Sequence, residues 1–197
     1  MTQIALFHSV LGVRPGIEDA AERLRDAGHD VLVVDQYDGR VFDDYDEASV
    51  HVEALGSFPE LMRRATVAVE PLPDGFVAAG FSNGAGMAEY VATQRRLAGV
   101  LMLSGTLPLA MLGVDAWPAG VPAQIHYATG DPNREQEWVD SVAASVLAAG
   151  APLEMFDYPG DGHLFTDPSL PDEYQPDDAA LLWERVLAFP PLAEDES

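Results

Sequence analysis

The chain has 197 residues, with 33 acidic and 10 basic side chains, a formal net charge of −23 and no cysteine. This charge argues against nucleic-acid and anionic-membrane partners. The absence of cysteine excludes disulfides, thiolate catalysis and Cys-based metal sites. All ten basic residues are arginine. The acidic balance fits either adaptation to a saline solvent or a GC-rich genome that replaces lysine by arginine, and the composition leaves both open.

The length suits one domain with a full hydrophobic core, which we expect to span residues 1–190, with 191–197 as a frayed acidic tail. Short apolar runs alternate with longer amphipathic stretches, which predicts an α/β fold with a parallel sheet. The predicted strands are 3–8, 30–35, 75–80, 99–104, 122–128 and 152–158. The predicted helices are 17–27, two within 47–69, 82–97, 134–149 and 176–188. No apolar run of membrane-spanning length and no secretory signal is found, so we expect a soluble cytoplasmic protein.

A serine stands on the turn that follows the third predicted strand. The segment Gly80-Phe81-Ser82-Asn83-Gly84 fits the pattern G-x-S-x-G and leads from a buried strand into a helix. That setting is typical of a nucleophile elbow, where the flanking positions must be small and the helix N-terminus favours developing negative charge. The pattern therefore predicts acyl transfer on Ser82.

A serine nucleophile needs a base to take its proton and an acid to orient that base. Asp131 and His163 follow the fifth and sixth predicted strands, in the order Ser…Asp…His that α/β-hydrolases use. Because parallel strands end at one edge of the sheet, we expect these two side chains to meet Ser82. Asp131 could instead cap the helix that follows it, and Asp157 and Asp161 are rival acids.

The other histidines are assigned differently. His126 falls inside a strand and is predicted to be a core residue, His29 to be structural, and His51 to lie on an exposed helical face.

An oxyanion hole in this architecture takes one backbone N–H from the residue after the nucleophile, here Asn83, and one from the loop after the first strand. Val10 is the first choice for the second donor, with Ser9 as the alternative. The side chains of His8, Ser9 and Ser104 are expected to line the substrate pocket, although His8 could instead pack beneath it.

Two loops, 35–47 and 166–178, are rich in acidic residues. We favour the interpretation that they form a solvated rim. The alternative is that they border the pocket, because both follow the carboxyl ends of strands.

These residues resemble the dienelactone hydrolase family of the α/β-hydrolase superfamily over nearly the whole chain. The matching segments are 8–12, 35–39, the elbow 80–84, the Gly-Asp turn at 130–131 and the loop 162–165. The resemblance implies a three-layer fold with a six-stranded, mostly parallel sheet in the order 2-1-3-4-5-6. It leaves little room for a lid, for which 40–69 is the candidate segment.

This chain departs from the family at three positions. The family's best-known members use cysteine as the nucleophile, where this chain has Ser82. Ser9 replaces a glutamate that is common in the first loop. Asp167 stands at the position of an arginine that binds the substrate carboxylate, and an acid there would favour neutral or cationic esters over dienelactone.

The sequence therefore predicts a hydrolase of small carboxylic esters or lactones that acts through Ser82, His163 and Asp131, with no cofactor and no metal. The expected partner is a small-molecule substrate, on a monomer or homodimer. The alternatives are a thioesterase or amidase on the same residues, or a non-catalytic binding protein of the same fold.

Overall fold

The computed structural model describes residues 1–192 of the chain. Six strands form one wholly parallel sheet in the order β2-β1-β3-β4-β5-β6. The order implied by the family resemblance is confirmed. The strands are β1 (Gln3–Phe7), β2 (Asp30–Val34), β3 (Phe76–Phe81), β4 (Leu97–Leu103), β5 (Ala123–Ala128) and β6 (Leu153–Tyr158).

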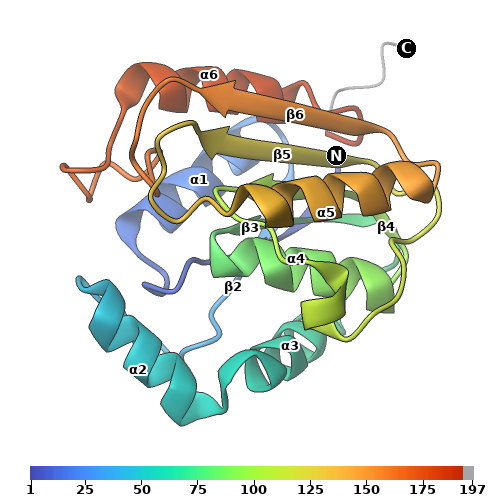
Figure 1. The fold of residues 1–197 in the computed structure, drawn as a ribbon, viewed down its shortest axis with the longest axis horizontal. Coiled ribbons are helices and arrows are strands. Elements are labelled where there is room, and N and C mark those ends of the chain that lie inside the picture. The colour runs from blue at the N-terminus through green and yellow to red at the C-terminus, as the bar shows by residue number, and fades with distance from the viewer. Residues whose placement is uncertain (193–197) are drawn as a thin grey trace.

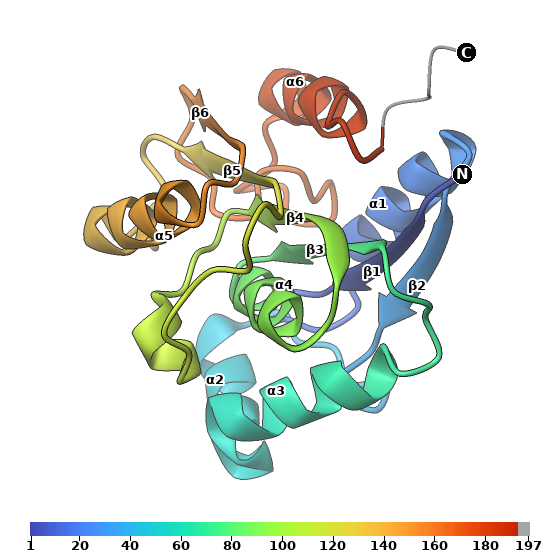
Figure 2. The ribbon, with the colours of Figure 1, turned by 90° about the vertical axis from the view of Figure 1, so that its right-hand side faces the viewer.

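Helices cover both faces of this sheet (Figures 1 and 2). Helices α1 (Pro15–Asp26) and α6 (Pro176–Leu187) pack on one face, where their apolar side chains join one buried cluster. Helices α3 (Ser57–Ala68), α4 (Asn83–Gln94) and α5 (Gln136–Ala148) contribute to the cluster on the other face. The fold is therefore a three-layer α/β architecture.

The central strands are buried on both faces because helices cover both. Every residue of β3 and β5 is buried. Strand β6 lies at the edge of the sheet and is only partly buried, as expected for a strand with one neighbour. Because all strands run parallel, the carboxyl ends of β1, β3, β5 and β6 lie at one edge of the sheet, where the predicted site residues follow.

The predicted segment 47–69 folds as two helices, α2 (Tyr45–Leu55) and α3, as expected from the break at Gly56. Gly56 has φ 117°, a left-handed conformation that glycine adopts at little cost. Asp44 caps α2 by accepting a hydrogen bond from the Glu47 N–H at 2.9 Å. Helix α2, which belongs to the candidate lid segment, lies at the lower left of Figure 1, away from the sheet.

The predicted bounds of the strands and helices lie within two residues of the observed ones, except at the end of the helix after the elbow. The helix after the elbow ends at Gln94 rather than residue 97, because Arg95 is already extended and Leu97 pairs with Phe76 in the sheet. A short 3₁₀ turn, η1 (Leu109–Leu112), was not predicted.

The C-terminal prediction concerns residues 191–197. Within it, Leu192 is buried in the α1–α6 cluster, and the Pro191 carbonyl accepts a hydrogen bond from Thr2. Residues 193–197 lie outside the described residues. Within residues 1–192 no helix is long and apolar enough to cross a membrane.

Candidate active site

Ser82 occupies a strained turn between β3 and α4. Its backbone has φ 53° and ψ −120°, a conformation rare for residues other than glycine. Hydrogen bonds fix both sides of the turn: the Ser82 N–H donates to the Leu103 carbonyl at 2.8 Å, and the Ala85 N–H donates to the Ser82 carbonyl at 2.9 Å. The surrounding structure therefore holds the side chain in one place.

Three glycines allow this turn to form. A Cβ atom on Gly80 would overlap the Gly84 backbone, and one on Gly84 would overlap the carbonyls of Phe7 and His8. These two contacts explain the small residues of the G-x-S-x-G pattern. A Cβ on Gly105 would overlap the Ser82 carbonyl. Gly105 follows β4, and the sequence analysis did not identify it.

His163 links the hydroxyl of Ser82 to the carboxylate of Asp131. The His163 Nε2 atom lies 2.8 Å from the Ser82 Oγ, and the Nδ1 atom lies 2.8 Å from the Asp131 Oδ2. The Asp131 side chain is fully buried, and that of His163 is nearly so. The loops after β3, β5 and β6 thus bring the three predicted residues into one hydrogen-bonded chain.

Asp131 has a second contact that fixes its orientation. Its Oδ1 atom accepts a hydrogen bond from the Asn133 N–H at 2.8 Å. With one oxygen occupied by this backbone donor, the other is left to accept from the Nδ1–H of His163. The alternative that Asp131 caps the following helix is wrong, because α5 begins at Gln136 with Glu135 at its N-cap position. The Asn133 contact lies instead in the loop that leads to this helix. The rival Asp157 is mostly exposed and pairs with Arg134 at 2.6 Å.

The loop that carries His163 is fixed from the 166–178 segment. The Leu164 N–H donates to the Glu173 Oε2 at 2.6 Å, and the Tyr45 hydroxyl donates to the Glu173 Oε1 at 2.8 Å. Tyr45 lies at the start of α2, with its ring centroid 6.1 Å from that of His163. Burial, followed by the Glu173 hydrogen bond, raises the pKa of Tyr45. Tyr45 and Glu173 therefore connect α2 to the histidine loop, a contact that the sequence analysis missed.

A cleft of about 570 Å³ has Ser82 among its lining residues. Val10, Asn83 and Ser104 line this cleft together with Ser82 and His163. Among residues 1–192, neither the Val10 nor the Asn83 backbone N–H donates a hydrogen bond within the protein. Both residues therefore border the same cleft as Ser82 with a backbone N–H that has no acceptor in the described part of the chain.

The expectation that the side chains of His8 and Ser9 line the cleft is corrected by the structure. His8 is buried; its Nε2 accepts a hydrogen bond from the Gln36 N–H at 3.0 Å, which leaves Nδ1 to donate to the Ser9 carbonyl at 2.6 Å. Burial lowers the pKa of His8. The Ser9 hydroxyl accepts from the Leu11 N–H at 3.2 Å. Both side chains stabilise the first loop from beneath instead of facing the cleft.

The expectation that Asp167 favours neutral or cationic esters is also corrected. Asp167 is buried outside the cleft, 3.5 Å from the Arg14 Nε, and accepts hydrogen bonds from Ser169. Asp167 does not line the cleft at Ser82, so its carboxylate does not contact a substrate there. The resemblance gave the position of this residue along the chain but not the direction of its side chain.

Two of the remaining histidines, His126 and His51, can be compared with their predicted places. His126 is fully buried in β5, as predicted, and burial lowers its pKa to about 3. His51 is not on an exposed face: its ring packs against Tyr37 and Phe42 at centroid distances of 5.1 Å.

Within the described residues, no group of three or more His, Asp or Glu side chains is arranged to hold a metal ion.

The three-layer fold and the elbow after β3 define an α/β-hydrolase-fold protein. The chain belongs to the dienelactone hydrolase family, whose sequence model matches residues 2–190. A search of curated proteins finds no match.

Solved structures of the same fold share little sequence with this chain. A dienelactone hydrolase-like promiscuous phosphotriesterase from metagenomic libraries superposes with a TM-score of 0.79 at 22% identity, covering 95% of this chain and 84% of the other. For a dienelactone hydrolase from Anabaena variabilis ATCC 29413 the TM-score is 0.64 at 19% identity, and the match covers 95% of this chain and 86% of the other. One of the metagenome-derived lipolytic enzymes LipS and LipT superposes with a TM-score of 0.69 at 17% identity, and the match covers 95% of this chain and 92% of the other.

Proposed function

We propose that the protein hydrolyses small carboxylic esters or lactones through an acyl-enzyme on Ser82. The observation that carries this proposal is the chain of two 2.8 Å contacts from Ser82 through His163 to Asp131. Fold alone would not support an enzymatic function, since many α/β folds host several. Membership of a hydrolase family and a cleft that opens at Ser82 support it further.

The first half of the reaction forms the acyl-enzyme. The Ser82 Oγ attacks the ester carbonyl while the His163 Nε2 accepts its proton. Asp131 accepts the Nδ1–H, which keeps the imidazole in the tautomer that leaves Nε2 free and stabilises the imidazolium. The backbone N–H groups of Val10 and Asn83 bind the oxyanion of the tetrahedral intermediate. His163 then protonates the leaving alcohol.

The second half releases the acid. A water molecule replaces the alcohol and gives its proton to the His163 Nε2 as it attacks the acyl-enzyme. The intermediate collapses when the histidine returns that proton to the Ser82 Oγ.

The test is hydrolysis of 4-nitrophenyl acetate by the wild type and by Ser82→Ala. We expect kcat to fall by about 10⁴-fold or more in the variant, since removing a triad member leaves only binding and the oxyanion donors. Ser141→Ala, an exposed substitution on α5 far from the elbow in the chain, is the matched control. A folded Ser82→Ala protein with a rate within tenfold of the wild type would contradict the proposal.

A further inference from the structure

Among residues 1–192, the side chains that line the cleft include two carboxylates and no arginine. Asp46 lies in the first turn of α2, and Glu135 lies at the N-cap position of α5. Both line the cleft that contains Ser82, and no arginine does. The two carboxylates come from different walls, and both residues are exposed at the rim. A substrate in the cleft therefore meets negative charge from two sides.

The arginines near the cleft already have carboxylate partners. Arg14 pairs with Asp43 at 2.6 Å and lies 3.5 Å from Asp167. Arg134 pairs with Asp157 at 2.6 Å and stacks over the ring of Tyr127, 5.2 Å from its centroid. Neither guanidinium lines the cleft, so neither is placed to hold a substrate carboxylate.

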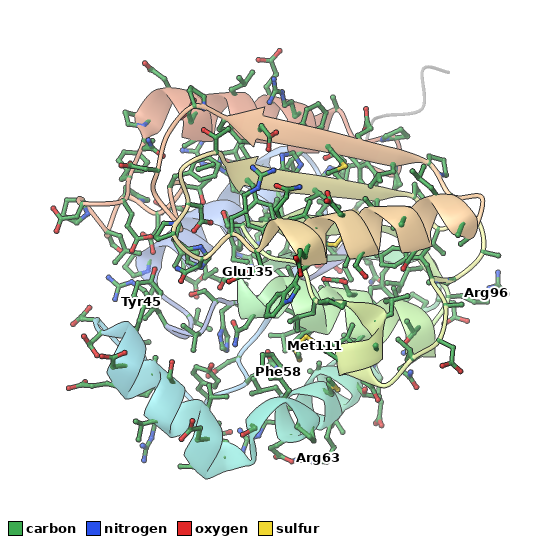
Figure 3. The ribbon with its side chains drawn as sticks, viewed as in Figure 1. Tyr45, Phe58, Arg63, Arg96, Met111 and Glu135 are labelled. Carbon is green, nitrogen blue, oxygen red and sulfur yellow. The ribbon has the colours of Figure 1, made fainter. Side chains whose placement is uncertain are left out.

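Aromatic rings make up much of the remaining wall. Tyr45 and Phe58 line the cleft from the α2–α3 side, and Trp138 lines it from α5. Tyr127 also lines it from β5, but the Arg134 guanidinium already stacks over that ring. Figure 3 labels Tyr45, Phe58 and Glu135, which border the space between α2, α3 and α5. Aromatic faces attract ammonium groups through their quadrupoles. Rings together with carboxylates are the side chains that recognise an organic cation.

We propose that this cleft selects esters that carry a fixed positive charge, such as quaternary-ammonium esters, over neutral and anionic esters of the same shape. The inference rests on the proposed ester hydrolysis and names its substrate class. Asp46 and Glu135 supply the attraction, and the aromatic walls accept the alkyl surface of the ammonium group. Because both carboxylates are exposed, the preference weakens as salt screens them.

The experiment compares three acetate esters that differ in charge. They are 2-(trimethylammonio)ethyl acetate, its neutral carbon isostere 3,3-dimethylbutyl acetate, and the anionic 3-sulfopropyl acetate. At low ionic strength we expect kcat/KM for the cationic ester to exceed that of the neutral one by about fivefold or more, from two surface charge pairs. We expect the anionic ester to fall below the neutral one, and the ratios to approach one at molar salt.

Variants assign the effect to the two rim carboxylates. In the double variant Asp46→Asn with Glu135→Gln, the cationic-to-neutral ratio is expected to fall to about one. The matched control is Glu53→Gln with Glu137→Gln, which removes the same net charge from exposed positions on α2 and α5 outside the cleft lining. That control is expected to keep the wild-type ratio.

Two kinds of failure are distinguishable. A cationic-to-neutral ratio near one in the wild type, alongside Ser82-dependent hydrolysis of 4-nitrophenyl acetate, would overturn the charge selection alone. An equal fall of the ratio in both double variants would overturn it as well, because it would assign the effect to net charge and not to the cleft. Absence of Ser82-dependent hydrolysis of any ester would overturn the proposed function and the selection together.

Discussion

Replacing Asp131 by asparagine tests whether this residue orients His163. In the structure, Asp131 accepts two hydrogen bonds, from the His163 Nδ1–H through Oδ2 and from the Asn133 N–H through Oδ1, both at 2.8 Å. Asparagine offers one acceptor oxygen and one NH₂ group. If the oxygen remains toward the Asn133 N–H, the NH₂ group faces Nδ1, and the imidazole must carry its proton on Nε2. A histidine protonated at Nε2 cannot accept the serine proton.

The alternative rotamer of the asparagine does not rescue this arrangement. It would restore an acceptor for the His163 Nδ1–H but place the NH₂ group against the Asn133 N–H, donor against donor. We therefore expect kcat for 4-nitrophenyl acetate to fall by about 10⁴-fold, which corresponds to about 5.5 kcal/mol of transition-state stabilisation. The shape of the side chain is unchanged, so the folded structure is expected to persist in circular dichroism.

The rival acids supply the controls for this substitution. Asp157→Asn alters an exposed carboxylate that pairs with Arg134, and Asp161→Asn alters an exposed residue of the histidine loop. Both variants are expected to retain activity near the wild-type value. A folded Asp131→Asn protein within tenfold of the wild type, or a larger loss in either control, would refute the assignment of Asp131.

Three further predictions concern the scaffold. Gly105→Ala is expected to lower both activity and thermal stability, since its Cβ would overlap the Ser82 backbone, at a cost of about 1–3 kcal/mol; an unchanged melting temperature and rate would contradict this. Glu173→Ala is expected to destabilise by about 1–3 kcal/mol in urea unfolding, because it leaves the Leu164 N–H without its acceptor; an unchanged midpoint would count against it. Burial lowers the pKa of His126 from 6.5 to about 3. Between these two pH values only the unfolded state takes up the proton, so the free energy of unfolding is highest above pH 6.5 and decreases as the pH falls toward 3. His126→Gln is therefore expected to flatten that pH dependence, and identical slopes in the two proteins would refute it.

The sequence predicted the features of the site that depend on local chain geometry. The elbow pattern identified Ser82 because a tight strand–turn–helix connection restricts its neighbours to small residues. Asp131 and His163 could be placed because each follows a strand, and parallel strands end at one edge of the sheet. These inferences needed only the order of elements along the chain.

The sequence could not predict the direction of side chains that pair with distant segments. Asp167 pairs with Arg14, and His8 accepts a hydrogen bond from the Gln36 N–H. Neither contact can be read from the residues that surround Asp167 or His8 in the sequence. The same holds for the contact of Tyr45 with Glu173, which makes α2 one wall of the cleft.

The end of α4 shows a second limit. The prediction extended this helix to residue 97, whereas Leu97 pairs with Phe76 in the sheet and belongs to β4. Sheet pairing overrode local propensity at this boundary, and only the assembled sheet shows where the strand begins.

The most direct test of the account is the intact mass of the protein after treatment with a fluorophosphonate probe, with the wild type beside Ser82→Ala. An activated serine displaces fluoride and keeps the phosphonyl group as a covalent adduct. The account predicts one adduct on the wild type and none on the variant. No adduct on the folded wild type, or the same adduct on Ser82→Ala, would contradict the claim that Ser82 is the nucleophile of a hydrolase.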